Sequence, residues 1–413
     1  MTERPRVVIA GAGPAGLFAA GRLAEAGAEV TIYDRMASPA RKFLLAGRGG
    51  LNLTHSEPRE AFLSRYPDLP AQVRAAIDAF PPSALRAFAA DLGQPTFVGS
   101  SGRVFPEAFK ASPLLRAWLT RLASLGVTLR SQHRFVGFAD DGRLIFEGPD
   151  GPVAPAHDVA LLALGGASWP RMGSDGAWTG ILAARGIPVR PLVASNTGID
   201  IAWSAGFADR FAGTPLKAIT LSIGDTRVRG EAMVTATGLE GGAIYALSAA
   251  LRAAVAAGKA SLTVDLKPDL AAPELASRLA RGRSGDSLSN VLKKQGGLAP
   301  VAAAILREGR GGPLSRDPAT LAAAIKGLAL PVAAMRPLER AISSAGGMDR
   351  AVIGETFEIA GHPGLFAAGE MLDWDAPTGG YLLQATFATA AAAARGMAAR
   401  LGLAMAEAPP PAW

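Results

Sequence analysis

A glycine turn near the start of the chain constrains the fold more than any other feature. The segment RVVIAGAGPAGLFAAGRLAEAGAEVTIYDR contains an apolar run at 6–10, three glycines, an amphipathic helix and a second apolar run at 29–33 that ends in an acid. This order is typical of the βαβ unit that binds a dinucleotide. Because the chain has 49 glycines, the triplet alone is weak evidence, and the strand, helix and acid around it carry the inference.

Each position of the turn has a separate physical task. Gly11 permits the tight turn, Gly13 lets the backbone approach a pyrophosphate, and Gly16 lets the helix pack closely on the strand. Free N–H groups at the helix start then face the phosphates. Asp34 is placed to accept hydrogen bonds from an adenosine ribose. The turn therefore predicts a dinucleotide site but does not distinguish FAD from NAD(P).

Composition excludes several classes of protein. There is no cysteine among the 413 residues, so disulfides, thiolate metal sites and Fe–S clusters are excluded. The four histidines have no metal-ligand spacing, so we expect no metal. No uninterrupted apolar run reaches the roughly 18 residues that a membrane span needs. We expect a soluble cytoplasmic protein of two or three domains, without a membrane partner.

The positive charge of the chain suggests anionic ligands. The formal net charge is +7, which would attract nucleic acid, an anionic cofactor or an anionic substrate. The densest basic cluster, at 278–294, lacks the interleaved aromatic residues on which bases stack. A nucleic-acid partner is therefore not expected, and the oligomeric state is left open.

Between its ends the chain alternates between sheet and helix patterns. The segment 40–57 is glycine-rich and basic, and we expect an ordered loop there rather than a helix. Strands are expected at 134–139 and 143–147, joined by a turn at 140–142. The continuous apolar run at 159–164 is typical of a strand buried on both faces of a parallel sheet.

A second glycine-acid block near the C-terminus favours FAD. An apolar run at 364–368 ends in Gly369 and Glu370, and Gly379 with Gly380 then opens a long alanine-rich helix. In flavoproteins a glycine-acid strand end lies near the ribitol of an extended FAD, and a helix N-terminus stabilises negative charge on the reduced ring. The FAD-binding domain is thus expected to be discontinuous.

This organisation predicts an α/β fold. A Rossmann-type FAD-binding domain is expected at 1–190 plus 346–413, with an inserted β-rich domain at 191–270 and a small helical domain at 271–345.

Four ordered blocks resemble one known family. GAGPAGLFAA, RKFLLAGRGGLNLTHSE, LALGGASWPRMGSDG and GEMLDWDAPTGGYLLQ are similar to blocks of the BaiN/YhiN-like NAD(P)/FAD-dependent oxidoreductases, a family that includes an aminoacetone oxidase. The GRGGLNLTH form matches a proteobacterial subgroup. The resemblance implies an FAD-dependent oxidoreductase that moves hydride between non-covalent FAD and a small organic substrate, with NAD(P)H as a transient donor. The alternative it leaves is a flavin-bound module in RNA modification or assembly.

The resemblance also assigns cofactor contacts by position. The ADP part of FAD is expected to contact Gly11, Gly13, Pro14, Ala15, Gly16, Asp34 and Arg35. The pyrophosphate and flavin are expected to contact Lys42, Arg48, Gly49, Gly50, Asn52 and Leu53. The adenine is expected to contact the backbone of Phe135 or Val136, and the adenosine end Gly165, Gly166, Trp169 and Gly176. The ribitol and isoalloxazine are expected to contact Gly369, Glu370, Gly379, Gly380, Tyr381 and Leu382.

The catalytic residues stay unknown, and two departures from the family suggest a different substrate. Many members have Arg-Cys-Asn where this chain has Gly-Leu-Asn at 50–52, and many have Tyr where it has Trp169. His55 is either a general base beside the flavin or a loop hydrogen-bonder. Asp373 and Asp375 either orient a substrate or cap a turn.

Overall fold

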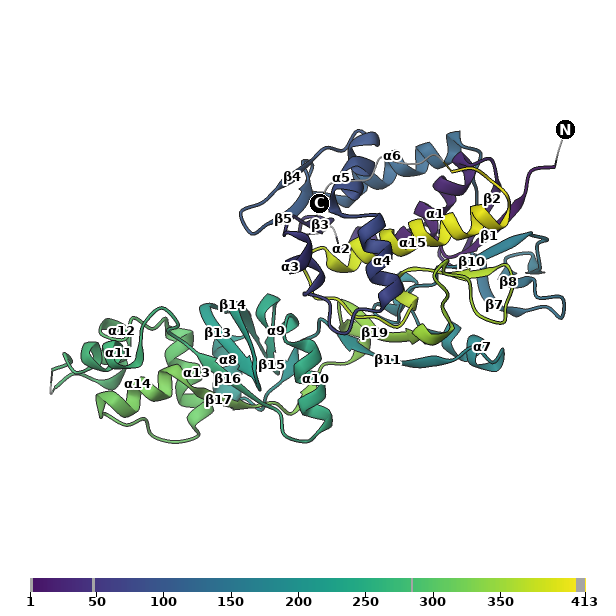
Figure 1. Ribbon diagram of the computed structural model, residues 1–413. Coiled ribbons are helices and arrows are strands. Elements are labelled where there is room, and N and C mark those ends of the chain that lie inside the picture. Colours follow the sequence, from purple (N-terminus) through teal and green to yellow (C-terminus); the bar gives the residue numbers. More distant parts are fainter. Residues whose placement is uncertain (1–2, 47–48, 284, 406–412) are drawn as a thin grey trace. The chain divides into compact units, whose positions relative to one another are not determined.

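A computed structural model describes residues 3–46, 49–283, 285–405 and 413. The chain divides into two compact units, which we call unit 1 (Met1–Val193 with Ser343–Trp413) and unit 2 (Ala194–Ile342). Unit 1 is discontinuous in the sequence. The borders of the insertion lie close to the expected positions 190 and 346. Within unit 1 the yellow C-terminal helix lies beside the purple N-terminal elements (Figure 1).

A parallel sheet forms the centre of unit 1. Its order is β20-β10-β1-β2-β6, and every pair of neighbours is parallel. The strands are β1 (Arg6–Ala10), β2 (Glu29–Asp34), β6 (Thr128–Ser131), β10 (Val159–Leu162) and β20 (Leu365–Ala367). The C-terminal strand completes the sheet that the N-terminal strand begins, which confirms the predicted Rossmann-type α/β fold.

Two helices from opposite ends of the chain pack together in unit 1. They are α1 (Pro14–Glu25) and α15 (Tyr381–Arg400). Alanines dominate the buried face of α15, and their short side chains allow close approach. Phe18, Trp118 and Phe387 contribute to an aromatic cluster beside them. This packing holds the starts of both helices at one edge of the sheet.

Shorter elements complete unit 1. They are α2 (Arg41–Ala46), β3 (Thr54–His55), α3 (Arg59–Leu63), α4 (Ala71–Ala79), α5 (Pro82–Asp91), β4 (Thr96–Val98), β5 (Arg103–Pro106), α6 (Ala111–Ser124), β7 (Arg134–Phe138), β8 (Leu144–Gly148), β9 (Gly151–Val153), η1 (Pro170–Met172), α7 (Trp178–Ala184), β11 (Val189–Ser195), β19 (Ser343–Met348), η3 (Arg350–Val352) and η4 (Gly369–Met371). The predicted hairpin is confirmed, because β7 and β8 pair antiparallel.

The prediction that 40–57 contains no helix is wrong. The segment holds α2 and the short strand β3. Its RKFLLA run consists largely of good helix formers, and Phe43 anchors the helix with only 3% of its surface exposed. The glycines and polar residues that suggested a loop come after this run.

Unit 2 is built on an antiparallel sheet covered by helices. The sheet order is β17-β16-β13-β14-β15-β12-β18. The elements are β12 (Ile199–Asp200), α8 (Ala205–Phe211), β13 (Pro215–Ile223), β14 (Thr226–Thr235), β15 (Gly238–Glu240), α9 (Gly242–Tyr245), α10 (Ser248–Ala256), β16 (Ser261–Asp265), α11 (Ala272–Leu279), α12 (Leu288–Lys294), α13 (Pro300–Arg310), α14 (Pro318–Lys326), β17 (Leu328–Pro331), β18 (Ala334–Met335) and η2 (Leu338–Arg340).

The β-rich and helical segments of the insertion share one hydrophobic core. Side chains from β13, α11 and α13 belong to the same buried cluster, and β17, which follows the helices, pairs with β16, which precedes them. The position expected to separate these segments, residue 270, therefore lies inside a single compact unit.

Candidate functional site

Two glycines of the N-terminal turn are required by the packing of the protein itself. Gly11 has a φ of +105°, and a Cβ added there would lie 2.3 Å from the carbonyl oxygen of Ala163. A Cβ added at Gly16 would lie 1.9 Å from the carbonyl oxygen of Gly11. These contacts bring β1, β10 and α1 together at the carboxyl edge of the sheet, as the sequence predicts.

Gly13 differs from its two neighbours in the motif. Its φ is −79°, which any residue adopts, and an added Cβ would meet no atom within 4 Å. It is the N-cap of α1, which has no side-chain cap and begins with Pro14. The free amides of this first turn and the helix dipole favour an anion. The open space at Gly13 therefore fits a pyrophosphate, and the packing of the protein does not explain the glycine.

Asp34 stabilises the glycine turn by accepting backbone hydrogen bonds. Its Oδ2 accepts a hydrogen bond from the Ala12 N–H at 2.7 Å, and its Oδ1 accepts one from the Met36 N–H at 2.8 Å. Burial raises the pKa of Asp34, while these two amides and Arg35 oppose the rise. Each oxygen keeps a second acceptor position, so the ribose contact stays a prediction. Arg35 forms an ion pair with Asp175.

The C-terminal block meets the N-terminal turn. Gly369 follows β20 with a φ of +85°, and an added Cβ would lie 3.0 Å from the Cβ of Ala15. The Gly369 N–H donates to Thr389 Oγ1 at 3.1 Å, and the Trp374 indole N–H donates to the Gly369 carbonyl at 3.0 Å. The two motifs that suggested FAD thus lie at the same edge of one sheet.

A partly buried charged network lies beside this meeting point. Lys42 Nζ donates to Glu370 Oε2 at 2.7 Å and to Ser168 Oγ at 2.6 Å. The Ser344 N–H donates to Glu370 Oε1 at 3.1 Å, and a Cβ at Gly166 would lie 1.7 Å from Ser344 Oγ. The network joins three of the sequence blocks through Lys42, Glu370 and Gly166. Sequence reasoning missed Ser168 and Ser344.

The start of α15 forms the other end of the candidate site. Gly379 and Gly380 have φ angles of +127° and +93°, and a Cβ at Gly380 would lie 2.5 Å from the Cα of Thr54. The helix has no side-chain cap. Among the described residues, Asn52 Oδ1 and Thr54 Oγ1 are buried without a hydrogen-bond partner. Free amides and two orphaned oxygens fit the polar edge of an isoalloxazine ring.

The ring of Tyr381 is buried and contacts other side chains of the protein. Its side chain is 4% exposed, its hydroxyl donates to Glu57 Oε2 at 2.8 Å, and its ring stacks on His55 with centroids 5.5 Å apart. Burial and the hydrogen bond to Glu57 raise its pKa. The expected flavin contact of Tyr381 therefore stays a prediction.

His55 acts as a loop hydrogen-bonder. Its Nε2 lies 3.0 Å from the carbonyl oxygen of Ser101, and its Nδ1 accepts from the Glu57 N–H at 3.2 Å. These contacts require the neutral tautomer with the proton on Nε2. Burial lowers the pKa of His55, in keeping with a neutral ring. Neither nitrogen is left to act as a general base.

The two acids after β20 have separate roles. Asp373 pairs with Arg190 Nε at 3.0 Å, and burial raises its pKa. Asp375 Oδ1 accepts from the Ala376 N–H at 2.8 Å, which agrees with the turn-capping interpretation. Neither contact supplies a proton donor or acceptor to a substrate.

The remaining assigned residues lie in the same four blocks. Arg48 lies outside the described residues. Gly49 has open space at its Cβ position, whereas a Cβ at Gly50 would lie 2.9 Å from the ring of Phe109. Leu53 is fully buried, and its N–H donates to the Val104 carbonyl at 2.9 Å. Leu382 follows Tyr381 in the first turn of α15.

The predicted adenine contacts lie in the β7–β8 hairpin. A register shift between Phe135 and Gly137 leaves Val136 outside the pairing. Phe135 is buried, whereas Val136 is 37% exposed. Bulges of this kind free backbone groups for other partners, so a backbone contact to a ligand at Val136 stays a prediction.

The third block is held by strained and tight backbone. Trp169 has a φ of +60° before η1, which is uncommon for a bulky residue. The Trp178 indole N–H donates to the Gly165 carbonyl at 2.9 Å. A Cβ at Gly176 would lie 2.8 Å from the Cβ of Ala167. These contacts fix the loop between β10 and α7.

Within the described part of the chain, no group of three or more His, Cys, Asp or Glu side chains could hold a metal ion. No helix in the same part of the chain has the length and apolar character that crossing a membrane requires.

Comparison with known proteins supplies a family. The model of the HI0933-like protein Rossmann domain matches residues 5–396. A curated relative, the 3-dehydro-bile acid delta(4,6)-reductase of Clostridium scindens, is 26% identical over 96% of this chain and 99% of that protein. The ribosomal RNA dihydrouridine synthase of Haemophilus influenzae is 41% identical over 68 residues, 16% of this chain and 17% of that protein.

One solved structure can be aligned with this chain over most of its length. The 3-ketosteroid-delta4-(5alpha)-dehydrogenase of Rhodococcus jostii RHA1, in complex with 4-androstene-3,17-dione, aligns with a TM-score of 0.46 and 18% identity. The alignment covers 97% of this chain and 98% of that one.

Proposed function

This chain belongs to the HI0933-like Rossmann family, and from that premise we propose that it is an FAD-dependent oxidoreductase that saturates a carbon–carbon double bond conjugated to a carbonyl. FAD is bound non-covalently, and NAD(P)H supplies the electrons as a transient co-substrate. In the balanced reaction, NAD(P)H and one proton are consumed, and the substrate gains one hydrogen on each carbon of the double bond.

The open space at Gly13 carries the cofactor part of the proposal. Gly11 and Gly16 are needed by the protein, but Gly13 faces a free first turn of α1 where a Cβ would meet no protein atom. Gly369 extends the same edge of the sheet toward the C-terminal block. Glycine at position 13 is thus explained by a ligand that approaches the backbone, which a pyrophosphate does.

The chain offers a defined set of contacts for this cofactor. Bound FAD supplies a hydride donor and acceptor, and the protein positions it and adjusts its electrostatics. The free amides at the start of α15 would place donors at the polar edge of the ring. Lys42 and Glu370 hold one another beside the end of β20, where the ribitol is predicted. Asn52 Oδ1 offers an acceptor that the protein does not use.

The substrate class is suggested by the two curated relatives. One is named as a delta(4,6)-reductase of a 3-dehydro-bile acid, and the other is named for making dihydrouridine. In each named reaction, a carbonyl compound with a conjugated double bond gains hydrogen across that bond. The shared reaction is therefore a better guide than either substrate.

A spectrum followed by anaerobic reduction tests this proposal. The cofactor released from native protein is expected to have the absorption spectrum of FAD, and NADH or NADPH should bleach the protein-bound flavin without oxygen. A 3-keto steroid with a conjugated double bond should then reoxidise it. A colourless protein that takes up no added FAD would contradict the proposal.

A second candidate substrate is RNA, because the positive charge is concentrated in one segment. Residues 271–316 contain eight basic and three acidic side chains, so they supply +5 of the chain's +7. Arg281, Arg283, Lys293 and Lys294 are exposed, and none forms an ion pair among the described residues. Such a surface would bind the phosphates of RNA in a salt-dependent manner.

The RNA candidate is tested with a double-lysine variant and a single-lysine control. The double variant K293Q/K294Q should weaken RNA binding and reduce the slope of log affinity against log salt by about 1 to 2. The exposed Lys259→Gln change in the same unit serves as the control and should leave both nearly unchanged. Equal effects of the two changes would remove the RNA candidate.

A further inference from the structure

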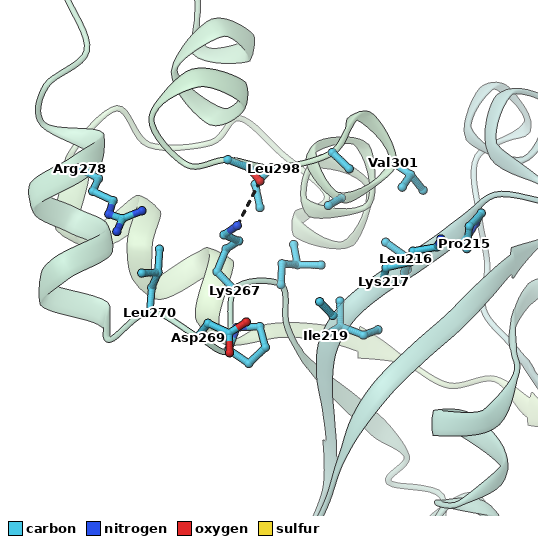
Figure 2. A pocket seen from close by; sticks show the side chains of 16 residues that line it. Pro215, Leu216, Lys217, Ile219, Lys267, Asp269, Leu270, Arg278, Leu298 and Val301 are labelled. Carbon is cyan, nitrogen blue, oxygen red and sulfur yellow. Dashed lines mark hydrogen bonds between the residues drawn. The ribbon is translucent and has the colours of Figure 1, made fainter. Parts of the chain in front are cut away.

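Unit 2 contains a cavity whose lining residues all belong to that unit. Its volume is about 360 Å³, which is at the lower end of the range for small-molecule sites. The walls are the start of β13, the connection from β16 to α11, the helix α11 and the turn that leads into α13. Figure 2 shows Lys267 between Arg278 on one side and Lys217 on the other.

The lining is unlike that of a packing void. Leu266, Leu298 and Val301 make an apolar floor and are almost completely buried. An empty void in a core is lined by apolar groups alone, whereas here the ammonium of Lys267 lies among them. The cavity therefore combines an apolar surface with a cation.

The cations of the cavity have unused capacity. Lys267 Nζ donates to the Gly297 carbonyl at 3.2 Å, and an ammonium has two further donors. The acid in the lining, Asp269, pairs with Arg229 at 2.6 Å. Arg278 is partnered by Glu274 at the rim. The local balance of charge thus favours a negative ligand.

The first turn of α13 adds donors to the same cavity. Val301 and Ala302 line it and are 4% and 7% exposed. Among the described residues, neither of their backbone N–H groups has a hydrogen-bond acceptor. The N-cap is Ala299, which has no side chain that could serve as the cap. The first N–H groups of a helix have no acceptor within it, so these two are available to a ligand.

The opposite wall carries a backbone irregularity. The pairing of β13 with β14 shifts between Leu216 and Ile219, and Ala218 has a φ of +51°. A left-handed conformation is unusual for a residue other than glycine, and such outliers gather at binding sites. The bulge leaves Lys217 outside the regular pairing, at the edge of the cavity.

We propose that this cavity binds a small organic anion that has a carboxylate head and a short aliphatic body. The head would lie between Lys267 and the free amides of Val301 and Ala302, and the body would lie on the apolar floor. The proposal stands apart from the proposed oxidoreductase function, because all its residues belong to unit 2 and the dinucleotide motifs belong to unit 1.

The test uses the full chain, purified with its cofactor, and three probes. Hexanoate, hexanol and inorganic phosphate are titrated by calorimetry and by saturation-transfer NMR. Hexanoate should bind, and hexanol should bind about tenfold or more weakly, because it lacks the charge-assisted hydrogen bonds. Phosphate should bind more weakly than hexanoate because it lacks the aliphatic body.

Two variants localise the binding. Ala299→Asp places a carboxylate at the N-cap, where it can accept from the free amides of α13 and also stabilise the helix. It should raise the melting temperature and weaken hexanoate binding at least about tenfold. Lys267→Gln should weaken hexanoate binding by a similar factor. Lys259→Gln, which changes an exposed lysine outside the cavity, should leave it unchanged.

Three results would overturn the proposal. One is equal binding of hexanol and hexanoate, which would show that charge plays no part. Another is phosphate binding that equals or exceeds that of hexanoate, which would remove the apolar part of the ligand. The third is hexanoate binding that persists at full strength in Ala299→Asp when its melting temperature has risen.

Discussion

Replacing Gly13 and Gly16 by alanine separates what the ligand requires from what the fold requires. The two glycines belong to the same motif, and their side-chain positions differ sharply. A Cβ at Gly16 would lie 1.9 Å from the carbonyl oxygen of Gly11 and 3.2 Å from Ile9 Cγ2, whereas a Cβ at Gly13 would meet nothing within 4 Å. We expect Gly16→Ala to destabilise the fold and Gly13→Ala to weaken cofactor binding.

The geometry gives the expected size of each effect. Carbon and oxygen atoms would overlap by more than 1 Å at Gly16, because contacts of a real Cβ shorter than 3.0 Å are essentially never seen. Overpacking of this kind costs about 3 kcal/mol or more. At Gly13 the alanine loses a better N-cap residue but restricts the unfolded chain, and these opposing effects are each about 1 kcal/mol. The stability of the FAD-free protein should therefore stay nearly unchanged.

Cofactor affinity should respond in the opposite order. A methyl group at Gly13 would occupy the approach to the first turn of α1 and displace one or two charge-assisted hydrogen bonds. The loss should be about 2 to 3 kcal/mol, or about thirty- to 150-fold in Kd. Urea unfolding of the FAD-free protein and a titration of FAD fluorescence measure the two quantities. A Gly13→Ala protein that binds FAD like the wild type would refute the reasoning.

Three further predictions concern the side chains around the site. Burial lowers the pKa of His55 in the folded protein. Its neutral form therefore stabilises the fold above a pH of about 6.5, and this stability is lost as pH falls through the lower folded pKa. The stability difference between wild type and His55→Gln should shrink on acidification, which urea titrations from pH 7.5 to 5 can measure. Tyr381→Phe should cost about 1 kcal/mol through the lost hydrogen bond to Glu57 and leave FAD affinity unchanged, and a large loss of affinity would contradict the inward-facing ring. Lys42→Met should destabilise the FAD-free protein by about 1 to 3 kcal/mol because Glu370 loses its partly buried partner, and adding Glu370→Gln should restore part of the loss in a double-mutant cycle.

Local backbone demands could be predicted from the sequence because they depend on neighbouring residues. The tight turn at Gly11 and the close packing at Gly16 follow from the strand and helix on either side of them, and both are confirmed. The return of the C-terminal strand could also be predicted, because a short apolar run before Gly369 has a buried parallel sheet as its natural place. The helix at 41–46 is not predicted, because the glycine-rich residues that follow it favour a loop and outweigh its own helix formers.

Contacts between distant loops could not be predicted in the same way. Ser168 and Ser344 meet the Lys42–Glu370 pair only after β10, β19 and β20 have taken their places. The sequence around a serine does not predict which distant side chain it will hydrogen-bond. His55 and Tyr381 stack on one another, and their orientation depends on Glu57, which accepts a hydrogen bond from the hydroxyl of Tyr381. The direction of a side chain is a property of packing rather than of a motif.

The glycines of the site therefore carry two kinds of information. Where a Cβ would collide with the protein, as at Gly11, Gly16 and Gly380, the glycine reports how the chain packs on itself. Where a Cβ would meet open space without backbone strain, as at Gly13, packing gives no reason for glycine, and a ligand does. The same comparison applies to amides: the first turns of α1 and α15 have no side-chain cap. Open space and free donors coincide at the edge where β1 and β20 end, and this coincidence makes a dinucleotide the simplest occupant.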